Sequence, residues 1–354
     1  MTAAASVSYA AAGVDIKAGE HAVELMKADV ARTRRPEVIG DLGGFAGLFA
    51  PDLSRFRRPV LATSTDGVGT KLAIARALDR HDTVGIDLVA MVIDDLVVVG
   101  AEPLFLTDYI AVGKVVPERI AAIVAGIAEG CVQAGCALLG GETAEHPGVM
   151  ATDDYDISAA GTGIVDADDL LGPDRVRPGD VLVAMASSGL HSNGYSLVRS
   201  VIASAGLGLD DRPPELGGVT LGEELLTPTR IYARDCLALI AAGGVRALAH
   251  VTGGGLAGNV ARVLPGTLDA TVDRSSWSPP AVFDYLGARG SIEQGELETA
   301  FNLGVGMVAV VAPERADAAV DLLTRHAVPA WVVGQVQSGR GRVVMTGEYA
   351  APLA

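Results

Sequence analysis

Ala62-Thr63-Ser64-Thr65-Asp66-Gly67-Val68-Gly69-Thr70-Lys71 joins a short apolar run, Pro59–Leu61, to the helix-forming segment Leu72–Leu78. The pattern predicts a strand, a glycine-containing turn and a helix. Such a corner offers three groups to a metal-bound polyphosphate: the Asp66 carboxylate for Mg²⁺, glycine amides for phosphate oxygens, and the Lys71 ammonium. The spacing does not match a Walker loop, which has four residues between its first glycine and its Gly-Lys pair. An ordinary structural corner explains the stretch equally well, so its meaning depends on the other segments.

Length and composition set the limits. The chain has 354 residues, which is longer than one core usually supports and predicts two domains. Hydrophobic residues make up 49% of it and aromatic residues 4%, with 44 glycines, a composition suited to close packing of helices on sheets. The formal net charge of -16 argues against a nucleic-acid groove or an anionic membrane surface as partner. An anionic substrate must therefore be held by specific donors.

The cysteines and the apolar segments predict a soluble, cytoplasmic protein. Residues 1–8 lack the basic start and apolar run of a signal peptide, and the first twelve residues are expected to fray. The longest apolar stretches, 84–99 and 120–137, contain acidic or amide side chains that a membrane span would exclude. Three cysteines without metal-site spacing are expected to be buried thiols: Cys131, Cys136 and Cys236.

Residues 85–100 are predicted to form a helix that is buried on most sides. Asp87 and Asp94 are seven residues apart and share one face of that helix, whereas Asp95 points about 100° away. Buried carboxylates without partners are costly, so paired acids here indicate a metal or another cation. Helix capping and salt bridges remain the alternative explanation.

A second strand, residues 136–139, again opens onto two glycines and an acid, in Gly140-Gly141-Glu142. Because strand ends and the acidic helix between them can meet, we expect Asp66, Asp95 and Glu142 to converge on a hard cation. His146 is expected to be a hydrogen-bonding turn residue. The cluster 41–49, with Gly43 and Gly44, predicts either a tight turn or a lid over a ligand.

The polar, proline-containing stretch 166–180 predicts a domain boundary, which divides the chain into residues 1–170 and 171–354. In the second half, strand 181–186 leads to residues 187–196 and a helix that ends at Ala205. Hydroxyls, an amide, glycines and His191 at a helix N-terminus suit an anion such as a phosphomonoester, although Ser192 or Asn193 could serve only as a cap.

Further along, residues 224–241 are predicted to start and continue one helix. Residues 252–255 form a second turn suited to an anion, because three consecutive glycines are hard to explain by packing alone. Gly304 and Gly306 formally fit a dinucleotide fingerprint, but the apolar strand follows them instead of preceding them, so a Rossmann site is rejected. Alternating strands and helices throughout place the chain in the α/β (α+β) class.

The motifs together resemble the phosphoribosylformylglycinamidine cyclo-ligases, the aminoimidazole ribonucleotide synthetases of purine biosynthesis. The resemblance extends from about residue 9 to residue 345 and rests on five long motifs in one order: residues 64–71, 85–91, 140–145, 191–199 and 252–255. It implies an ATP-dependent ligase that closes the ring of formylglycinamidine ribonucleotide, giving 5-aminoimidazole ribonucleotide, ADP and phosphate. The formyl amide oxygen is phosphorylated, and the amidine nitrogen then attacks that carbon. It also implies a homodimer whose first-domain sheets join, with ATP near the junction.

The resemblance further implies roles for particular residues. The predicted Mg²⁺ ligands are Asp66, Asp94, Asp95 and Glu142. The predicted ATP contacts are Gly43, Gly44, Asp66, Gly67, Lys71, Asp95, Gly141, Glu142 and Thr143. The predicted substrate contacts are Ser188, Gly189, His191, Ser192, Asn193, Thr252, Gly253, Gly254 and Asn259. Asp66, Lys71 and His191 are the predicted catalytic groups.

Four positions depart from the family pattern. The family usually has Asn where this chain has Asp94, Asp where it has Ala11, Met where it has His146 and Glu where it has Gly258. Related ATP-binding families fit less well. Selenophosphate synthetase would need a reactive Cys near the N-terminus, and the hydrogenase maturation factor would end in Cys. Thiamine monophosphate kinase lacks the loop of residues 191–196 in this form. A catalytically dead nucleotide-binding regulator remains an alternative that substrate-dependent ADP release would exclude.

Overall fold

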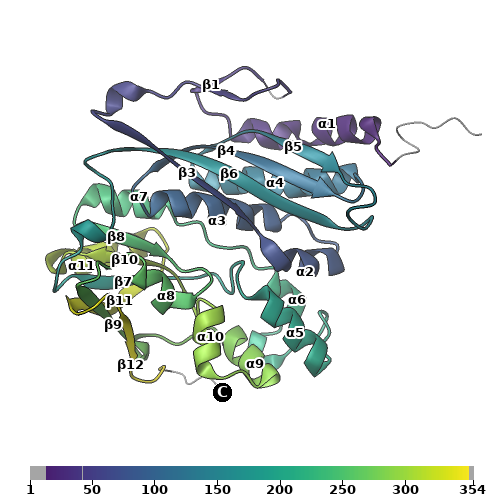
Figure 1. The fold of residues 1–354 in the computed structure, drawn as a ribbon. Helices are drawn as coiled ribbons and strands as arrows, with labels where there is room; N and C mark the ends of the chain where they lie inside the picture. Colours follow the sequence, from purple (N-terminus) through teal and green to yellow (C-terminus); the bar gives the residue numbers. More distant parts are fainter. Residues whose placement is uncertain (1–12, 42, 351–354) are drawn as a thin grey trace, which may run out of the picture.

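The computed structural model describes residues 13–41 and 43–350, which form two α/β parts (Figure 1). Residues 1–12, where fraying was expected and where Ala11 lies, are outside the described residues. The helices are α1 (Ile16–Arg32), α2 (Leu72–Ala77), α3 (Val84–Val97), α4 (Pro117–Ala134), α5 (Tyr195–Ala205), α6 (Leu221–Leu225), α7 (Ala233–Ala242), α8 (Gly255–Ala261), α9 (Ala281–Gly290), α10 (Gln294–Ala300) and α11 (Ala316–Arg325). The strands are β1 (Val38–Ile39), β2 (Leu48–Phe49), β3 (Pro59–Gly67), β4 (Glu102–Val112), β5 (Ala137–Glu145), β6 (Tyr155–Asp166), β7 (Val181–Ala186), β8 (Val245–His250), β9 (Leu268–Asp273), β10 (Val305–Val311), β11 (Ala330–Ser338) and β12 (Val343–Thr346).

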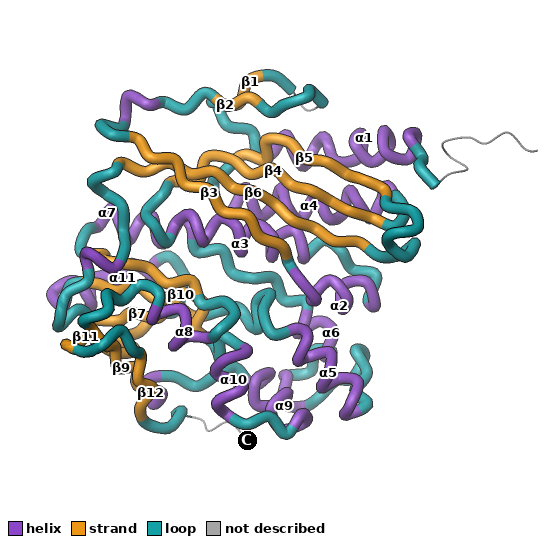
Figure 2. The backbone as a smooth tube through the Cα atoms, in the orientation of Figure 1, coloured by secondary structure: helices purple, strands orange, loops and turns teal. Residues whose placement is uncertain are grey.

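The first part is built on a four-stranded sheet in the order β3-β6-β4-β5. β6 pairs antiparallel with both β3 and β4, and β4 pairs parallel with β5. Helices α1, α3 and α4 lie on one face of this sheet, and Figure 2 shows no helix on the other. Because only one face of the sheet is covered, burial alternates along β3. Its even-numbered residues are partly buried, whereas Leu61 on the other face is 65% exposed.

α3 is the buried helix that the sequence predicted, and it lies between the sheet and α4. A glycine allows the close crossing of the two helices. A Cβ atom on Gly85 would lie 2.2 Å from the backbone nitrogen of Ile127 in α4. Any larger residue would force the helices apart, and with them the aspartates of α3.

The second part contains a six-stranded sheet in the order β12-β9-β11-β7-β10-β8. Its strands pair antiparallel except for β12 and β9, which are parallel. Every residue of β10 is buried, as expected for an interior strand covered on both faces. The glycines at 304 and 306 precede this strand or begin it, which agrees with the rejection of a Rossmann turn.

Three predicted elements differ from the structure. β3 does not stop at Leu61 but continues to Gly67, so Asp66 is the penultimate residue of the strand instead of a loop residue. The strand predicted for residues 136–139 likewise continues to Glu145 as β5, so Gly140-Gly141-Glu142 lies within a strand and not at its end. The single helix predicted for residues 224–241 is broken, because α6 ends at Leu225 and α7 begins at Ala233. Pro228 disfavours helix at the residue before it. The extended segment 227–232 instead makes hydrogen bonds to the first part of the chain.

Within the described ranges, no helix combines the length and the hydropathy that crossing a membrane requires. The observed mixture of helices and sheets confirms the predicted α/β class.

Candidate active site

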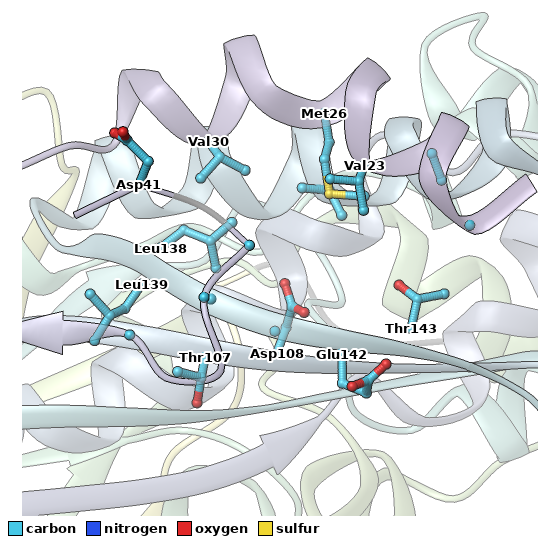
Figure 3. Close-up of a pocket in the computed structure, with 18 of the residues that line it drawn as sticks. Val23, Met26, Val30, Asp41, Thr107, Asp108, Leu138, Leu139, Glu142 and Thr143 are labelled. Carbon is cyan, nitrogen blue, oxygen red and sulfur yellow. The ribbon is translucent and has the colours of Figure 1, made fainter. Parts of the chain in front are cut away.

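Some of the predicted site residues line three cavities, and the others are buried or lie in neighbouring turns. The first, here the β5-edge cavity, has a volume of about 560 Å³ and lies between α1, Asp41 with residues 43–47, and the middle parts of β4 and β5 (Figure 3). Five predicted ATP contacts line it: Gly43, Gly44, Gly141, Glu142 and Thr143. The structure thus brings Gly43 and Gly44 next to Gly140-Gly141-Glu142, although the two motifs are about a hundred residues apart.

The second, here the interdomain cavity, has a volume of about 460 Å³ and is lined by both parts of the chain. Asp66 and Gly67 contribute from the end of β3, and Asn193 and Thr252 contribute from two loops of the second part. The Gly67 backbone N–H donates to Asp66 Oδ1 at 2.7 Å, which orients the carboxylate at the strand end. This cavity therefore joins the predicted metal side to the predicted substrate side.

The third, here the β8 cavity, has a volume of about 290 Å³ and is lined by Asp95, His250, Asn259 and Arg262. His250 Nδ1 lies 3.0 Å from Asp95 Oδ1. Burial opposes protonation of His250, but the hydrogen bond to Asp95 and the negative charges of Asp94, Asp95 and Asp66 raise its pKa. Asp66 and Asp95 are thus both close enough to act electrostatically on one imidazole.

The predicted convergence of Asp66, Asp95 and Glu142 within one chain is wrong. Across the sheet, Asp66 pairs with Ala159, Ala159 with Asp108, and Asp108 with Gly141. Three strand spacings separate Asp66 from Gly141, roughly 14 Å. Glu142 is one residue further along β5, so its side chain points to the opposite face. Among the described residues, no group of three His, Cys, Asp or Glu side chains could hold a metal ion.

Asp87 and Lys71 form a buried ion pair that connects the two parts of the chain. Lys71 Nζ donates to Asp87 Oδ1 at 2.9 Å and to the carbonyls of His191 and Thr227 at 3.0 and 2.7 Å. Asp87 Oδ1 also accepts from the backbone N–H and the hydroxyl of Thr229. Burial lowers the pKa of Lys71 and raises that of Asp87, while their mutual attraction opposes both shifts.

This arrangement contradicts the predicted role of Lys71. Its side chain has no exposed surface, and three protein oxygens accept its hydrogen bonds. An ammonium group has three donors, so none remains for phosphate in this conformation. Sequence alone suggested a phosphate contact because the lysine follows two glycines, but two of the three acceptors, the His191 and Thr227 carbonyls, are 120 and 156 positions away.

Asp94 does not face a cavity as a metal ligand would. It is fully buried, and its two oxygens accept from the Tyr232 backbone N–H at 3.0 and 3.2 Å. Burial raises its pKa to about 7, with the neighbouring His250 acting in the opposite direction. An asparagine carbonyl would accept the same hydrogen bond, so this departure from the family pattern preserves the contact.

His191 also differs from its prediction as a catalytic, substrate-contacting group. It is 2% exposed, and its Nε2 accepts from the Ser188 backbone N–H at 3.2 Å. Burial, with additional effects from His250 and Lys71, holds its pKa well below the usual range, so the ring is neutral. Its backbone has φ +65° and its ring packs against Tyr232. The buried His191 side chain therefore stabilises the conformation of the loop 188–193.

Other polar groups of the predicted substrate loops also bind the protein itself. Ser188 Oγ donates to the Pro228 carbonyl, and Ser192 Oγ lies 3.2 Å from Thr229 Oγ1. Asn259 Nδ2 donates to three carbonyls of the turn 252–255, which makes it a positioning residue for that turn. The capping alternative is wrong as well, because Gly194 is the N-cap of α5 and makes no side-chain capping bond. The first amides of α5 therefore remain available to an anion.

Sequence reasoning missed Asp108, which lines the β5-edge cavity from β4 (Figure 3). Burial raises the pKa of its carboxyl group to about 7. A signal existed, because Leu106 and Ile110, which alternate with Asp108 on the same face of the strand, are both apolar. A carboxylate in an otherwise apolar alternation is a candidate functional residue.

Comparisons with known proteins identify the family of the chain. Residues 54–165 match the family described as AIR synthase related protein, N-terminal domain, and residues 177–346 match its C-terminal domain. A phosphoribosylformylglycinamidine cyclo-ligase of Geobacillus thermodenitrificans is 51% identical over 341 residues, covering 96% of this chain and 98% of the relative. One of Anaeromyxobacter sp. is 52% identical over 336 residues, covering 95% and 97%.

Solved structures share the fold at lower identity. Thiamine-monophosphate kinase from Stenotrophomonas maltophilia aligns with a TM-score of 0.66 and 22% identity over 92% of this chain and 96% of that one. The hydrogenase maturation protein HypE in complex with ATP aligns with a TM-score of 0.64 and 20% identity over 94% and 92%. At this identity the likeness shows the fold alone.

Proposed function

The chain belongs to the phosphoribosylformylglycinamidine cyclo-ligase family. We propose that the β5-edge, interdomain and β8 cavities together bind the reactants of that enzyme's reaction. The enzyme uses ATP to convert formylglycinamidine ribonucleotide into 5-aminoimidazole ribonucleotide, ADP and phosphate, a step of purine biosynthesis. The observation that carries this function is the identity of about one half over nearly the whole chain. The two-domain organisation supports a boundary near residue 170, between the end of β6 and the start of β7.

The chemistry divides into two steps. The formyl amide oxygen takes the γ-phosphoryl group of ATP, which turns a poor leaving group into phosphate. The amidine nitrogen then forms a bond to the same carbon, the C–O bond breaks, phosphate leaves and a proton is lost. Without activation, oxygen would have to leave as hydroxide or water, so phosphorylation lowers the barrier to ring closure.

In this proposal the phosphoribosyl substrate occupies the interdomain cavity. Asn193 and Thr252 line it, and the free first-turn amides of α5 lie directly after Asn193. Helix N-termini with unpaired N–H groups bind phosphate well. Gly253 and Gly254 belong to the second turn beside Thr252. Gly254 N-caps α8 with φ +93°, a conformation that favours glycine.

Asp66 and Asp95 suit a magnesium ion that is also bound by substrate phosphates. Mg²⁺ is usually held by one or two carboxylates and keeps its remaining positions for water and phosphate oxygens. Asp66 faces the interdomain cavity, and the side chain of Asp95 is 41% exposed. When bound, the ion would neutralise charge on the transferring phosphoryl group. The residues' own contribution is to orient oxygen ligands through the Gly67 and His250 contacts.

A homodimer accounts for the position of Glu142. The helix-free face of the first sheet carries exposed groups such as Leu61 and Tyr109. In the proposed dimer this face packs against the same face of a second copy, so that β5 of one subunit lies near β3 of the other. Glu142 could then join Asp66 and Asp95 across the interface, with ATP in the β5-edge cavity beside them. The cytoplasmic location remains a prediction.

The direct test is to mix the purified protein with formylglycinamidine ribonucleotide and MgATP. We expect formation of the aminoimidazole product together with one ADP per turnover. ADP release without product, or only in the absence of the ribonucleotide, would contradict the proposed function. A protein that binds ATP and makes neither ADP nor product would instead be the catalytically dead regulator.

A further inference from the structure

Asp108 places its carboxyl group on the floor of the β5-edge cavity. Its neighbours on the same face of β4, Leu106 and Ile110, have no exposed surface. Figure 3 shows the carboxyl group pointing toward α1, on the side where Val23 and Met26 lie. Within the described ranges, no hydrogen bond or ion pair to this carboxyl group is present. The group therefore has hydrogen-bonding capacity that the protein leaves unused.

The cavity is shaped around this carboxyl group. A Cβ atom on Gly141, in the adjacent strand β5, would lie 1.9 Å from Asp108 Oδ1. Only glycine at this position leaves room for the observed side-chain conformation. The walls above are apolar and come from α1 and α4, through Ala22, Met26 and Val124. A polar group at the base of an apolar pocket is the usual way in which a protein orients a small ligand.

We propose that the Asp108 carboxyl group recognises an N–C–N edge of amidine type in the ligand that enters the β5-edge cavity. Two ligands of the reaction carry such an edge: adenine, through N1, C6 and the exocyclic amine, and the formylglycinamidine substrate, through its amidine. The inference rests on the proposed function, which brings both molecules to the protein. It assigns to Asp108 a specificity-determining contact.

The two sources differ in the hydrogen bonds that they require. The adenine edge has one acceptor and one donor, which a carboxylic acid matches with its hydroxyl and its carbonyl oxygen. A cationic amidine has two donors, which an ionised carboxylate matches with two acceptors. Burial raises the pKa of Asp108 to about 7, so both forms are populated near neutral pH. Either pairing satisfies a carboxyl group that has no hydrogen-bond partner among residues 13–41 and 43–350.

Two substitutions separate these sources. Asp108→Asn keeps one donor and one acceptor but cannot offer two acceptors, whereas Asp108→Ala removes both. Binding of AMP and of formylglycinamidine ribonucleotide would be measured separately by titration calorimetry, without turnover. If adenine is the ligand, AMP should bind Asp108→Asn within a few-fold of wild type and Asp108→Ala about ten-fold or more weakly. If the amidine is the ligand, both variants should bind the ribonucleotide about ten-fold or more weakly.

The controls make failure unambiguous. Asp317→Asn makes the same carboxylate-to-amide change at an exposed position of α11 and should bind both ligands like wild type. Thermal unfolding should show the two Asp108 variants at least as stable as wild type near pH 8, because each removes a buried charge. Unchanged binding of both ligands to a folded Asp108→Ala would overturn the inference. Wild-type protein that binds neither ligand would overturn the proposed function itself.

Discussion

Asp87 and Asp94 lie two helical turns apart on α3 and hold the same segment of the second domain, through the backbone N–H groups of Thr229 and Tyr232. Seven helical residues rise roughly 10.5 Å, and three extended residues span about 10 Å, so the two spacings match. The two carboxylates lie on one face of α3, as their seven-residue spacing predicted, and that face meets the domain junction. The junction in turn fixes the loops that line the interdomain cavity.

Lys71→Met should destabilise the protein by about 3–5 kcal/mol, because it leaves the Asp87 charge buried without its partner. Chemical denaturation at pH 7 measures this loss. The double variant Lys71→Met/Asp87→Leu should recover part of it, since no unpaired charge remains. Normal stability of Lys71→Met combined with weak ATP binding would restore the phosphate-contact role that the sequence suggested.

Asp94→Asn should stabilise the protein at pH 8 and have little effect near pH 4. The pKa of Asp94 is raised to about 7 in the folded state, above its unfolded value. Folded protein therefore binds the extra proton between about pH 4 and pH 7, and wild-type stability falls as the pH rises through this window. Asparagine keeps the Tyr232 contact without ionising. The melting temperature of Asp94→Asn minus that of wild type should increase from pH 5 to pH 8. A difference that stays constant over this range would contradict the prediction.

Asp66→Asn should lower turnover by about 100-fold or more and leave the melting temperature unchanged, because a metal contributes several kcal/mol to phosphoryl transfer. Glu142→Gln should do the same. Coexpression of the two variants tests the proposed dimer: if Asp66 and Glu142 act across the interface, half of the sites in each mixed dimer contain both native carboxylates. Recovered activity supports the shared site, whereas an inactive mixture with confirmed mixed dimers would place both groups in one subunit.

His191→Asn should make the free energy of unfolding less dependent on pH between 5.5 and 7.5. The folded pKa of His191 lies well below its usual value, so unfolding takes up a proton at acidic pH. The wild-type stability from this group is present above about pH 6.5 and is lost as the pH falls. Asparagine tolerates the positive φ at this position. An unchanged pH slope would show that the imidazole is accessible after all.

Gly141→Ala should displace the Asp108 carboxyl group and destabilise the protein by about 1–3 kcal/mol, because the new Cβ atom would overlap Oδ1. Gly140→Ala is the matched control, since a Cβ atom there would meet nothing within 4 Å. Thermal unfolding and AMP binding of the two variants provide the comparison. Equal effects at both glycines would show that the backbone, and not the carboxyl group, requires glycine.

The sequence was sufficient to predict features that depend on residues close together in the chain. The strand predicted for residues 181–186 is β7, and the helix predicted to end at Ala205 is α5. Chain length and the polar stretch 166–180 predicted two domains, and the order of the motifs predicted the family and the reaction. These features depend on periodicity and on turn chemistry within a few residues, which a single chain displays directly. The break between α6 and α7 was visible in principle at Pro228, but its stabilising hydrogen bonds were not.

Tertiary structure decided which polar side chains face a ligand and which hold the fold together. Lys71, Asp94 and His191 have the residue types of a site, yet each is buried and contacts the segment 227–232. That segment is distant in sequence, since Thr227 is 156 residues from Lys71 and Tyr232 is 138 residues from Asp94. Conversely, Asp108 lies in an unremarkable strand and faces a cavity only because Gly141 of the next strand leaves room for it. Burial and hydrogen-bond partnership depend on segments that meet only after folding, so residue type and spacing alone could not assign these roles.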